Sequence, residues 1–460
     1  MAGSTVDGLV SGLSTSSLIS QLMQVERVPQ TQLKSKVTAQ EKIQTSYQAI
    51  NTKLAALKTA AEDMTKGTSW QPAKVTSSST SVTPTTTAGA TTGSVTFDVL
   101  STAKAQVSTV TFGSATDPAL AGGATKVSLT IGTAAAVDID VTTNTPQGVA
   151  EAINAKGLDV RASVLTTDQG TVLQLTSTKT GTAAGFEITG LASDPVDLVP
   201  PKDAQVLVGD ADGVHYTVTS GSNAITGLLA GTTINVTKEE TGVTVAVTQD
   251  KDAIADKMKA FVDATNAVLT EIGTQTSYNA AAKTKQPLAG NATVRQIAQT
   301  VLGQVGTGQT DYGSFAQLGV ELDRYGKLTF DREEFLKAYE ADPAKVEKAM
   351  SAEDPSIPPR LDADGKTLPQ TQVSNVMGLA ARLKVIVSNS TESITNAVNG
   401  SKSLVTDLNK RIEAWDLRLE RRETALRRQF TNLEVSLGKL QQQSTWLAGQ
   451  ISSLPAPSSE

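Results

Sequence analysis

Two short segments carry residue types that could bind calcium. The segments 210–213 and 362–365 both read Asp-Ala-Asp-Gly. An EF-hand loop needs a longer series of oxygen ligands closed by a glutamate, with a glycine near its middle. Here the glycine comes fourth, Val214 or Lys366 follows where another ligand belongs, and no glutamate closes either loop. Asp and Gly are also the residues that turns prefer, so both segments are interpreted as plain turns.

Other residue types that support catalysis are scarce. The chain has no cysteine and one histidine, His215, which excludes disulfide scaffolds, thiolate nucleophiles and multi-histidine metal centres. His215 is interpreted as an ordinary residue at the start of a strand rather than as a catalytic base. Asp138 and Asp140 share one face of a predicted strand, which could hold an adventitious cation or simply face solvent. We therefore expect no catalytic residue, no cofactor and no metal site.

The densest cluster of charge lies between Arg418 and Arg428. Nucleic-acid binding is one interpretation of its arginines. Acidic residues interleaved from Glu413 to Glu423 instead favour ion pairs between residues one helical turn apart. Arg422 falls within an apolar stripe, where a polar residue can specify the register of a coiled coil. We favour a structural or partner-binding role for this cluster over nucleic-acid binding.

Length and charge narrow the possible classes of protein. The 460 residues suffice for about three domains of ~150 residues. The 40 Lys and Arg against 46 Asp and Glu give a net charge of −6, which argues against nucleic-acid binding by bulk electrostatics. No secretory signal peptide is visible, and no apolar run reaches the ~18 residues of a membrane span. We expect a cytoplasmic protein, or one exported by a route that does not read a signal peptide.

Residues 1–69 have a helical pattern. Ser14 or Thr15 can cap a first helix, and Pro29 fits the first turn of a second helix better than the middle of one rod. The apolar face of the first helix is Leu18, Ile19, Leu22 and Met23. The narrow seam of the second is Ile43, Tyr47, Ile50, Leu54, Leu57, Ala61 and Met64. Such a seam is typical of a coiled coil or a long bundle helix.

Residues 70–250 instead have a β pattern. From residue 75 to 96, 14 of 22 residues are Ser or Thr, a composition suited to strands, loops or a linker. This zone has 8 Lys and Arg against 16 Asp and Glu, a net charge of −8, so the acidity of the chain is concentrated there. One helix is expected at 146–155. Strands are expected at 95–100, 126–131, 159–166, 171–176, 205–208, 214–219, 233–237 and 243–248.

Helical periodicity returns at Asp252. We expect a helix with an apolar stripe over 254–272, another after residue 291, and a helix pair at 331–350 broken at Pro343. A long final helix is expected from about residue 372 to 451. Its stripe, with a local stutter around Leu426, reads Val405, Leu408, Ile412, Trp415, Leu419, Arg422, Leu426, Phe430, Leu433, Leu437 and Leu440.

The apolar stripes at both ends of the chain predict the architecture. A narrow stripe cannot be buried by its own helix, and isolated helices are marginal in water. Pairing the terminal helices buries both stripes and leaves the β region between them. The predicted fold class is therefore α+β, elongated and multi-domain: an antiparallel helical bundle or coiled coil built from both chain ends, with nested β-rich domains inserted in the middle. Any stripe left uncovered would favour self-association or docking to another helical assembly.

Several segments of the chain resemble a known family in the right order. They are Gly-Leu-Val-Ser-Gly-Leu-Ser-Thr at 8–15, Leu-Ile-Ser-Gln-Leu-Met at 18–23, then Glu26 and Pro29, and later 146–181, 253–272, 286–295, 428–434 and 443–451. Together they resemble bacterial flagellar filament cap proteins, the hook-associated protein 2 family. The family more often has Asp where Ser14 stands, and Ser caps a helix about as well. The Ser/Thr-rich part after residue 75 matches nothing specific.

The resemblance implies a function for the chain. Cap proteins of this family form a homo-oligomeric ring, pentameric in some relatives, at the growing tip of the flagellum, with terminal helices as legs and β domains as a plate. The resemblance implies type III export, an extracellular location, and help for flagellin folding and polymerisation without covalent catalysis. The implied partners are further copies, flagellin, the hook–filament junction protein and an export chaperone, with no nucleic acid and no membrane insertion.

Three other functions stay open at this point. An adhesin would use the acidic, Ser/Thr-rich β domains to bind host or surface glycans. An enzyme would need a carboxylate pair in the β region, although glycosidase sites usually lie among aromatic side chains, which are rare there. A hook–filament junction protein also uses terminal helices, but the Gly-Leu-Val-Ser-Gly-Leu opening favours the cap.

The same reasoning predicts domains and contact residues. The domains are a terminal helical leg region (1–42 and 400–460), a helical bundle domain (43–69 and 251–399), an inner β domain (70–105 and 200–250) and an outer β/α domain (106–199). The candidate oligomer or filament contacts are Leu9, Leu13, Leu18, Ile19, Leu22, Met23, Leu419, Arg422, Leu426, Phe430, Leu433, Leu437, Leu440 and Leu447.

Overall fold

The chain forms two compact units. The structure is a computed structural model that describes residues 12, 14–281, 283–358, 360–361, 364, 367–368 and 370–452. The helical unit comprises Met1–Thr65 and Met258–Glu460, and the β unit comprises Lys66–Lys257. The β unit is thus a single insertion between two helical segments, which confirms the α+β class and the inserted β-rich region predicted from the sequence.

The helical unit consists of long helices with a few short strand pairs. Its helices are α1 (Thr15–Glu26), α2 (Val28–Thr65), α4 (Lys251–Thr276, which begins in the β unit), α5 (Ala292–Thr307), α6 (Arg332–Ala341), α7 (Pro343–Ser351) and α8 (Leu379–Ser452), with the 3-10 turn η3 (Phe315–Leu318). The strand pairs are β16 (Tyr278–Asn279) with β17 (Thr284–Lys285), β18 (Val320–Leu322) with β19 (Leu328–Phe330), and β20 (Arg360–Leu361) with β21 (Thr367–Leu368). The helix break predicted at Pro343 is confirmed.

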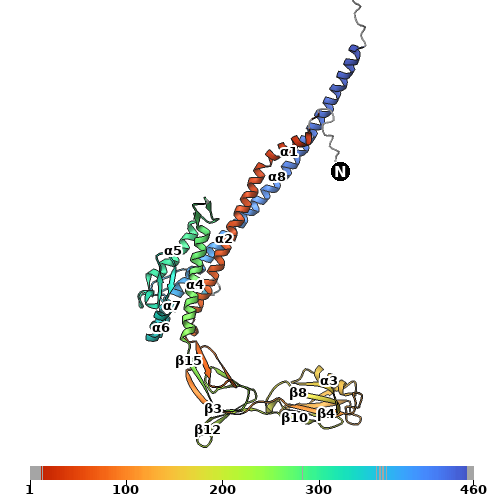
Figure 1. Ribbon diagram of the computed structural model, residues 1–460, viewed down its shortest axis with the longest axis vertical. Coiled ribbons are helices and arrows are strands. Elements are labelled where there is room, and N and C mark those ends of the chain that lie inside the picture. Colours follow the sequence, from red (N-terminus) through yellow and green to blue (C-terminus); the bar gives the residue numbers. More distant parts are fainter. Residues whose placement is uncertain are drawn as a thin grey trace, which may run out of the picture. The chain divides into compact units, whose positions relative to one another are not determined.

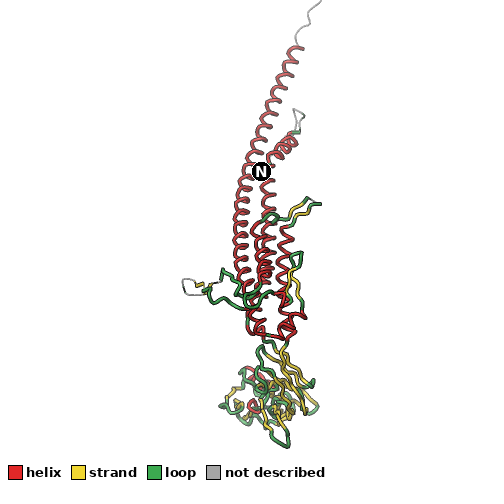
Figure 2. Tube along the Cα trace, turned by 90° about the vertical axis from the view of Figure 1, so that its left-hand side faces the viewer, coloured by secondary structure: helices red, strands yellow, loops and turns green. Residues whose placement is uncertain are grey.

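The central contact of the helical unit joins α2 to α8, which lie side by side in both views (Figures 1 and 2). Gln40 Nε2 donates to Ser401 Oγ at 2.6 Å, and Asn51 Nδ2 donates to Thr395 Oγ1 at 3.5 Å. Residue numbers therefore rise along one helix as they fall along the other, so the pair is antiparallel. The predicted seam of α2 faces this core, with Tyr47, Ile50, Leu54, Leu57, Ala61 and Met64 buried and Ile43 half-buried.

A one-residue break separates α1 from α2. Arg27 lies between them, and its backbone N–H donates to the carbonyl of Met23 at 3.0 Å, which closes α1. Pro29 falls in the first turn of α2, where a backbone N–H has no helical partner to lose. The break predicted at Pro29 is therefore confirmed.

The first part of the β unit contains two antiparallel sheets. One has the order β1-β15-β3-β11-β12 and the other β13-β14-β2. The strands are β1 (Ala73–Ser77), β2 (Val82–Thr86), β3 (Gly93–Ser101), β11 (Ala204–Gly209), β12 (His215–Ser220), β13 (Ala224–Thr226), β14 (Thr232–Val236) and β15 (Glu240–Gln249). Their shared core includes Phe97, Val206 and Ile234, so strands from before and after the middle of the unit pack together.

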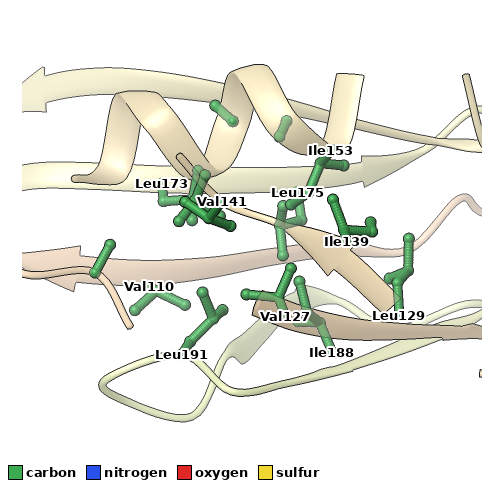
Figure 3. Packing of buried hydrophobic residues seen from close by; sticks show 14 of the residues in the cluster. Val110, Val127, Leu129, Ile139, Val141, Ile153, Leu173, Leu175, Ile188 and Leu191 are labelled. Carbon is green, nitrogen blue, oxygen red and sulfur yellow. The ribbon is translucent and has the colours of Figure 1, made fainter. Parts of the chain in front are cut away.

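The second part of the β unit packs two further sheets and one helix around a separate core (Figure 3). The sheets have the orders β10-β4-β8-β7 and β6-β5-β9. Their elements are β4 (Val107–Phe112), β5 (Lys126–Ile131), β6 (Val137–Asp140), α3 (Pro146–Ala155), β7 (Val160–Thr167), β8 (Gly170–Ser177), β9 (Phe186–Thr189) and β10 (Val196–Val199). Leu173 and Leu175 of β8 contribute to the same core as Ile153 of α3 and Val127 of β5.

Some elements differ from the sequence prediction. Within residues 70–250 the pattern misses β1, β2, β4, β9, β10 and β13. The composition around β1 and β2 suits strands, loops or a linker alike, and β9, β10 and β13 have four residues or fewer, too short for a period of two to stand out. The long final helix begins at Leu379 rather than near residue 372. Gly378 precedes it because a Cβ there would lie 2.3 Å from the backbone carbon of Met350, so this close approach requires glycine.

A buried cation ties α8 to the end of α5. Arg382 is completely buried, its Nη2 donates to the carbonyl of Gly308 at 2.5 Å, and its Nη1 donates to Gln304 Oε1 at 3.3 Å. Burial lowers the pKa of Arg382 to about 10, so the side chain stays charged at neutral pH. Its charge meets the carbonyl end of α5, which carries a partial negative charge, and the ring of Phe315 at 5.2 Å.

We predict that Arg382→Ala lowers the free energy of unfolding of the helical unit by about 3 kcal/mol, because it opens a cavity and leaves α5 carbonyls unpaired. Arg382→Lys keeps the charge but loses the forked donor geometry of the guanidinium. Its free energy of unfolding should therefore lie between that of Arg382→Ala and that of the parent chain. Urea unfolding followed by circular dichroism measures both. Equal midpoints for all three chains would contradict this role.

A second junction lies at the start of α5. Asn291 caps this helix, accepting from the backbone N–H of Val294 at 3.0 Å, while its Nδ2 donates to Tyr47 Oη of α2 at 2.7 Å. We predict that Asn291→Ala costs about 2 kcal/mol, because it removes both the cap and the link. Tyr47→Phe removes only the link and should cost about 1 kcal/mol. Thermal unfolding of the two variants separates the contribution of the helix cap from that of the hydrogen bond to Tyr47. If Tyr47→Phe loses as much stability as Asn291→Ala, Asn291 contributes nothing as a helix cap.

Candidate assembly interface

The first part of the interface is an apolar contact between α1 and α8. Ile19 and Met23 of α1 are buried, with exposed fractions of 6% and 3%, against Leu419 and Leu426 of α8, while Trp415 and Phe430 border the cluster. Their spacing places all of them on one stripe of each helix. The structure therefore brings together five of the residues that the sequence nominated, counting Phe430 at the edge.

Polar pairs accompany this apolar contact. Gln30 is buried and its Nε2 donates to Asp416 Oδ1. Arg422 Nε lies 3.4 Å from Glu26 Oε1, and the Arg422 side chain is half exposed. Arg422 thus lies beside the apolar cluster and joins α8 to the end of α1, instead of being buried within the stripe. Such pairs specify which turn of one helix faces which turn of the other.

Two further arginines of the cluster make contacts along α8 itself. Arg427 Nη2 lies 2.8 Å from Glu423 Oε1, one turn away, and the Arg418 guanidinium lies 4.7 Å from the centre of the Trp415 ring. These exposed contacts contribute at most about 1 kcal/mol each. The pairing within the helix agrees with the structural interpretation of the cluster.

The helix α8 continues past the region that α1 covers (Figure 1), and leucines continue its apolar stripe there. Leu433, Leu440 and Leu447 recur every seven residues, and 47%, 61% and 52% of their side chains are exposed. Leu437 is half-buried, whereas Trp446 and Ile451 are exposed. A seven-residue repeat of leucine is the pattern by which one helix packs against another. We call Leu433, Leu440 and Leu447 the open seam.

The other nominated residues are distributed as follows. Leu18 and Leu22 lie on the outward side of α1, with 37% and 46% of their side chains exposed. They are joined by Val25 and Val28, which the sequence reasoning missed although both continue the apolar character of this face. Leu9 and Leu13 lie outside the described residues.

The turn at 210–213 and the neighbouring His215, considered for metal binding and catalysis, form ordinary local structure. His215 is exposed, and its Nδ1 lies 3.2 Å from the carbonyl of Asp210 and 3.1 Å from that of Gly213. Hydrogen bonds from Lys126 and Ser128 hold the pKa of Asp138 below its usual value. Across the residues that the structure describes, no three His, Cys, Asp or Glu side chains converge in a way that could hold a metal ion. Residues 362, 363 and 365 of the second turn lie outside that range.

A shallow groove separates α5 from α8. It has a volume of about 620 Å³ and its lining is rich in Thr, Ser, Asn and Gln, with Ile297, Val373 and Ile386 as its apolar part. The lining holds no ionisable side chain, so the groove can hydrogen-bond a polar segment but offers no acid or base. None of the described helices is long and apolar enough to cross a lipid bilayer.

Family models match both ends of the chain. Residues 202–442 match the model described as flagellar hook-associated protein 2 C-terminus, and residues 11–106 match flagellar hook-associated protein 2 N-terminus. The C-terminal match alone spans more than half of the 460 residues. It includes α8 as far as the open seam residues Leu433 and Leu440.

Individual relatives agree with these matches. The chain is 28% identical over 224 residues to the lateral flagellar hook-associated protein 2 of Vibrio parahaemolyticus, a match that covers 46% of this chain and spans half the length of that relative. It is 24% identical over 487 residues to flagellar hook-associated protein 2 of Escherichia coli K12, covering 98% of each.

A solved structure has a similar fold. The crystal structure of the D1-D2-D3 domains of the Escherichia coli flagellar cap protein FliD superposes with a TM-score of 0.59 at 23% identity, covering 78% of this chain and 99% of that one. The fold, the two family models and their order along the sequence agree, and the chain belongs to the flagellar hook-associated protein 2 family.

Proposed function

We propose that this protein caps the growing end of a flagellar filament as a homo-oligomer and promotes the addition of flagellin subunits. The observation that carries the proposal is the open seam, a leucine repeat on α8 that continues the contact between α8 and α1 but remains exposed. A helix with such a seam is suited to binding other helices. Family membership supports the same function.

The open seam is suited to a contact that forms and breaks. Burying one leucine fully gains at most about 3 kcal/mol, and each seam leucine is already about half covered. The gross gain from all three is therefore about 4 kcal/mol, comparable with the smallest estimates of what association costs. One copy would bind weakly and release readily, whereas several copies in a ring would hold the filament end together.

In the proposed mechanism no covalent bond is made or broken. The leg region, residues 1–42 and 400–460, engages helices of filament subunits, the bundle domain at 43–69 and 251–399 supports it, and the inner (70–105 and 200–250) and outer (106–199) β domains form the plate that shields the vacant site. The remaining partners we propose are the hook–filament junction protein and an export chaperone, with type III export to the flagellum tip outside the cell. None of the comparisons favours the adhesin alternative.

We predict that the double variant Leu440→Asp/Leu447→Asp folds like the parent but no longer supports filament growth, because two charges on the seam prevent helix packing. Gln442→Asp is the matched control, since residue 442 is exposed on the opposite side of the same helix. Complementation of a strain lacking its cap protein, scored by swarming and by flagellin lost to the medium, measures both. Normal filaments from the double variant would refute the proposed role of the seam.

The polar pair between α2 and α8 generates a further prediction. Asp416→Ala removes the partner of the buried Gln30 amide and should cost about 1 kcal/mol of local stability, because that amide stays desolvated. Adding Gln30→Leu removes the unpaired group and should restore the loss. Hydrogen exchange of the α1 and early α2 amides measures this local opening. Identical exchange in the single and double variants would show that the pair has no such effect.

A further inference from the structure

The edge strand β10 exposes its aliphatic side chains. β10 pairs only with β4, at one edge of the sheet β10-β4-β8-β7. Val196 and Leu198 flank Asp197, and 69% and 68% of their side chains are exposed. The pairing with β4 is irregular between Asp197 and Val199, and Val199 is half-buried. Strands with one buried face normally turn their aliphatic residues toward that face, whereas β10 leaves two of its three aliphatic side chains exposed.

The residue between them is polar and turns the other way. Asp197 Oδ1 accepts a hydrogen bond from Ser108 Oγ at 2.6 Å and one from Gln106 Nε2 at 2.9 Å. Both donors are buried, with exposed fractions of 1% and 6%, and Ser108 lies on the same side of β4 as the core residue Val110. These hydrogen bonds fix the pairing of Asp197 with Ser108, because a shift by one residue would break them and turn Val196 inward. The exposure of Val196 is therefore specified by the structure.

Val196 and Leu198 belong to a wider uncovered surface. α3 and the sheet β6-β5-β9 pack on the core side of β10-β4-β8-β7, so the side chains on its other side form an outer face. The outer face also carries Val107, Val172 and the 46% exposed Leu165, with Ser, Thr and Gln between them. Along the described residues of these four strands, Arg161 is the single charged residue that points outward.

The acidity of the β unit indicates what kind of partner can bind the outer face. Residues 70–250 carry 16 Asp and Glu against 8 Lys and Arg, so two copies of this region repel each other over most of their surfaces. The four strands turn no carboxylate toward the outer face: the single one, on Asp197 of β10, belongs to an exposed residue but is hydrogen-bonded by Ser108 and Gln106. An acidic neighbour, such as another copy of this chain, can therefore approach the outer face with little repulsion between like charges.

We propose that the outer face of the sheet β10-β4-β8-β7 binds a second copy of this chain. The inference rests on the proposed function, in that a homo-oligomeric cap requires a contact between copies, and it names the surface that makes it. Val196 and Leu198 anchor the contact by burying aliphatic area that is now exposed, and the strand edge of β10 offers backbone groups for hydrogen bonds to the neighbour.

The first experiment measures self-association of the full chain by sedimentation velocity. Val196→Thr/Leu198→Thr places β-branched residues, which favour strands, at both positions while removing apolar surface. We expect the concentration at which the oligomer dissociates to rise by about tenfold or more. Val214→Thr is the matched control, because Val214 is 95% exposed in the turn before β12, outside the outer face, and its substitution should leave association unchanged.

The second experiment identifies the neighbour directly. The natural chain has no cysteine, so Leu198→Cys creates one attachment site for a benzophenone maleimide. Illumination of the labelled chain, with and without purified flagellin, should yield a covalent dimer of this chain in both samples. Val214→Cys carrying the same label should yield little dimer.

The outcomes separate this inference from the proposed function. If the oligomer forms, but the double variant does not weaken it and the label at residue 198 gives no cross-linked dimer, the outer face is not the contact between copies. That result would leave the proposed capping function intact. Equal effects at residues 198 and 214 would overturn the assignment to this face, and a cross-link to flagellin alone would overturn the choice of occupant. A parent chain that remains monomeric at every concentration would overturn the contact and the homo-oligomeric cap together, whereas loss of filament growth from the open-seam variant tests capping alone.

Discussion

The helical unit depends on covering the apolar stripe of one helix, α8, which runs for 74 residues from Leu379 to Ser452. No single element covers it. α2 lies along its first part, α1 covers the next part around Leu419 and Leu426, and the stripe then continues as exposed leucines. Because α1 and α2 precede the β unit and α8 follows it, the stripe is also what brings the two ends of the chain together. The β unit is held between segments that must meet for either to be stable.

The contacts that bury the apolar stripe change from mainly apolar to partly polar along α8. Near its start, Leu54, Leu57 and Ala61 of α2 are completely buried, and Arg382 adds a buried cation held by carbonyl groups of α5. Toward α1, the polar pairs of Gln40 with Ser401 and Gln30 with Asp416 replace part of the apolar contact. Polar pairs fix register but add less stability than apolar packing. Local opening should therefore cost least near α1, the end of the contact that lies next to the open seam.

How far the sequence predicts this structure depends on whether a residue's environment follows from its neighbours in the chain. α3 begins and ends where expected, because Pro146 follows the capping residue Thr145 and the apolar spacing is regular. The stripes of α2 and α8 are visible for the same reason. The sequence cannot show that Arg382 is buried or that Ser108 faces a core, because in both cases the partners are distant in the chain. Most candidate residues were nominated by helical period, which finds the stripe but does not say which part of it remains open.

The two surfaces identified here follow from one physical requirement. The proposed cap needs contacts with the filament that are individually weak, so that they can form and break. It also needs contacts between its own copies that persist while the filament contacts exchange. The open seam of α8 offers three half-covered leucines, which suits exchange. The outer face of the sheet carries one outward charge, Arg161, and is held in register at Asp197 by hydrogen bonds, which suits a lasting contact. The carboxylate of Asp197 satisfies buried donors of the isolated chain, whereas Val196 and Leu198 remain exposed in it. In the proposed contact a second copy would cover both aliphatic side chains, and burial of this apolar area would contribute to the free energy of association.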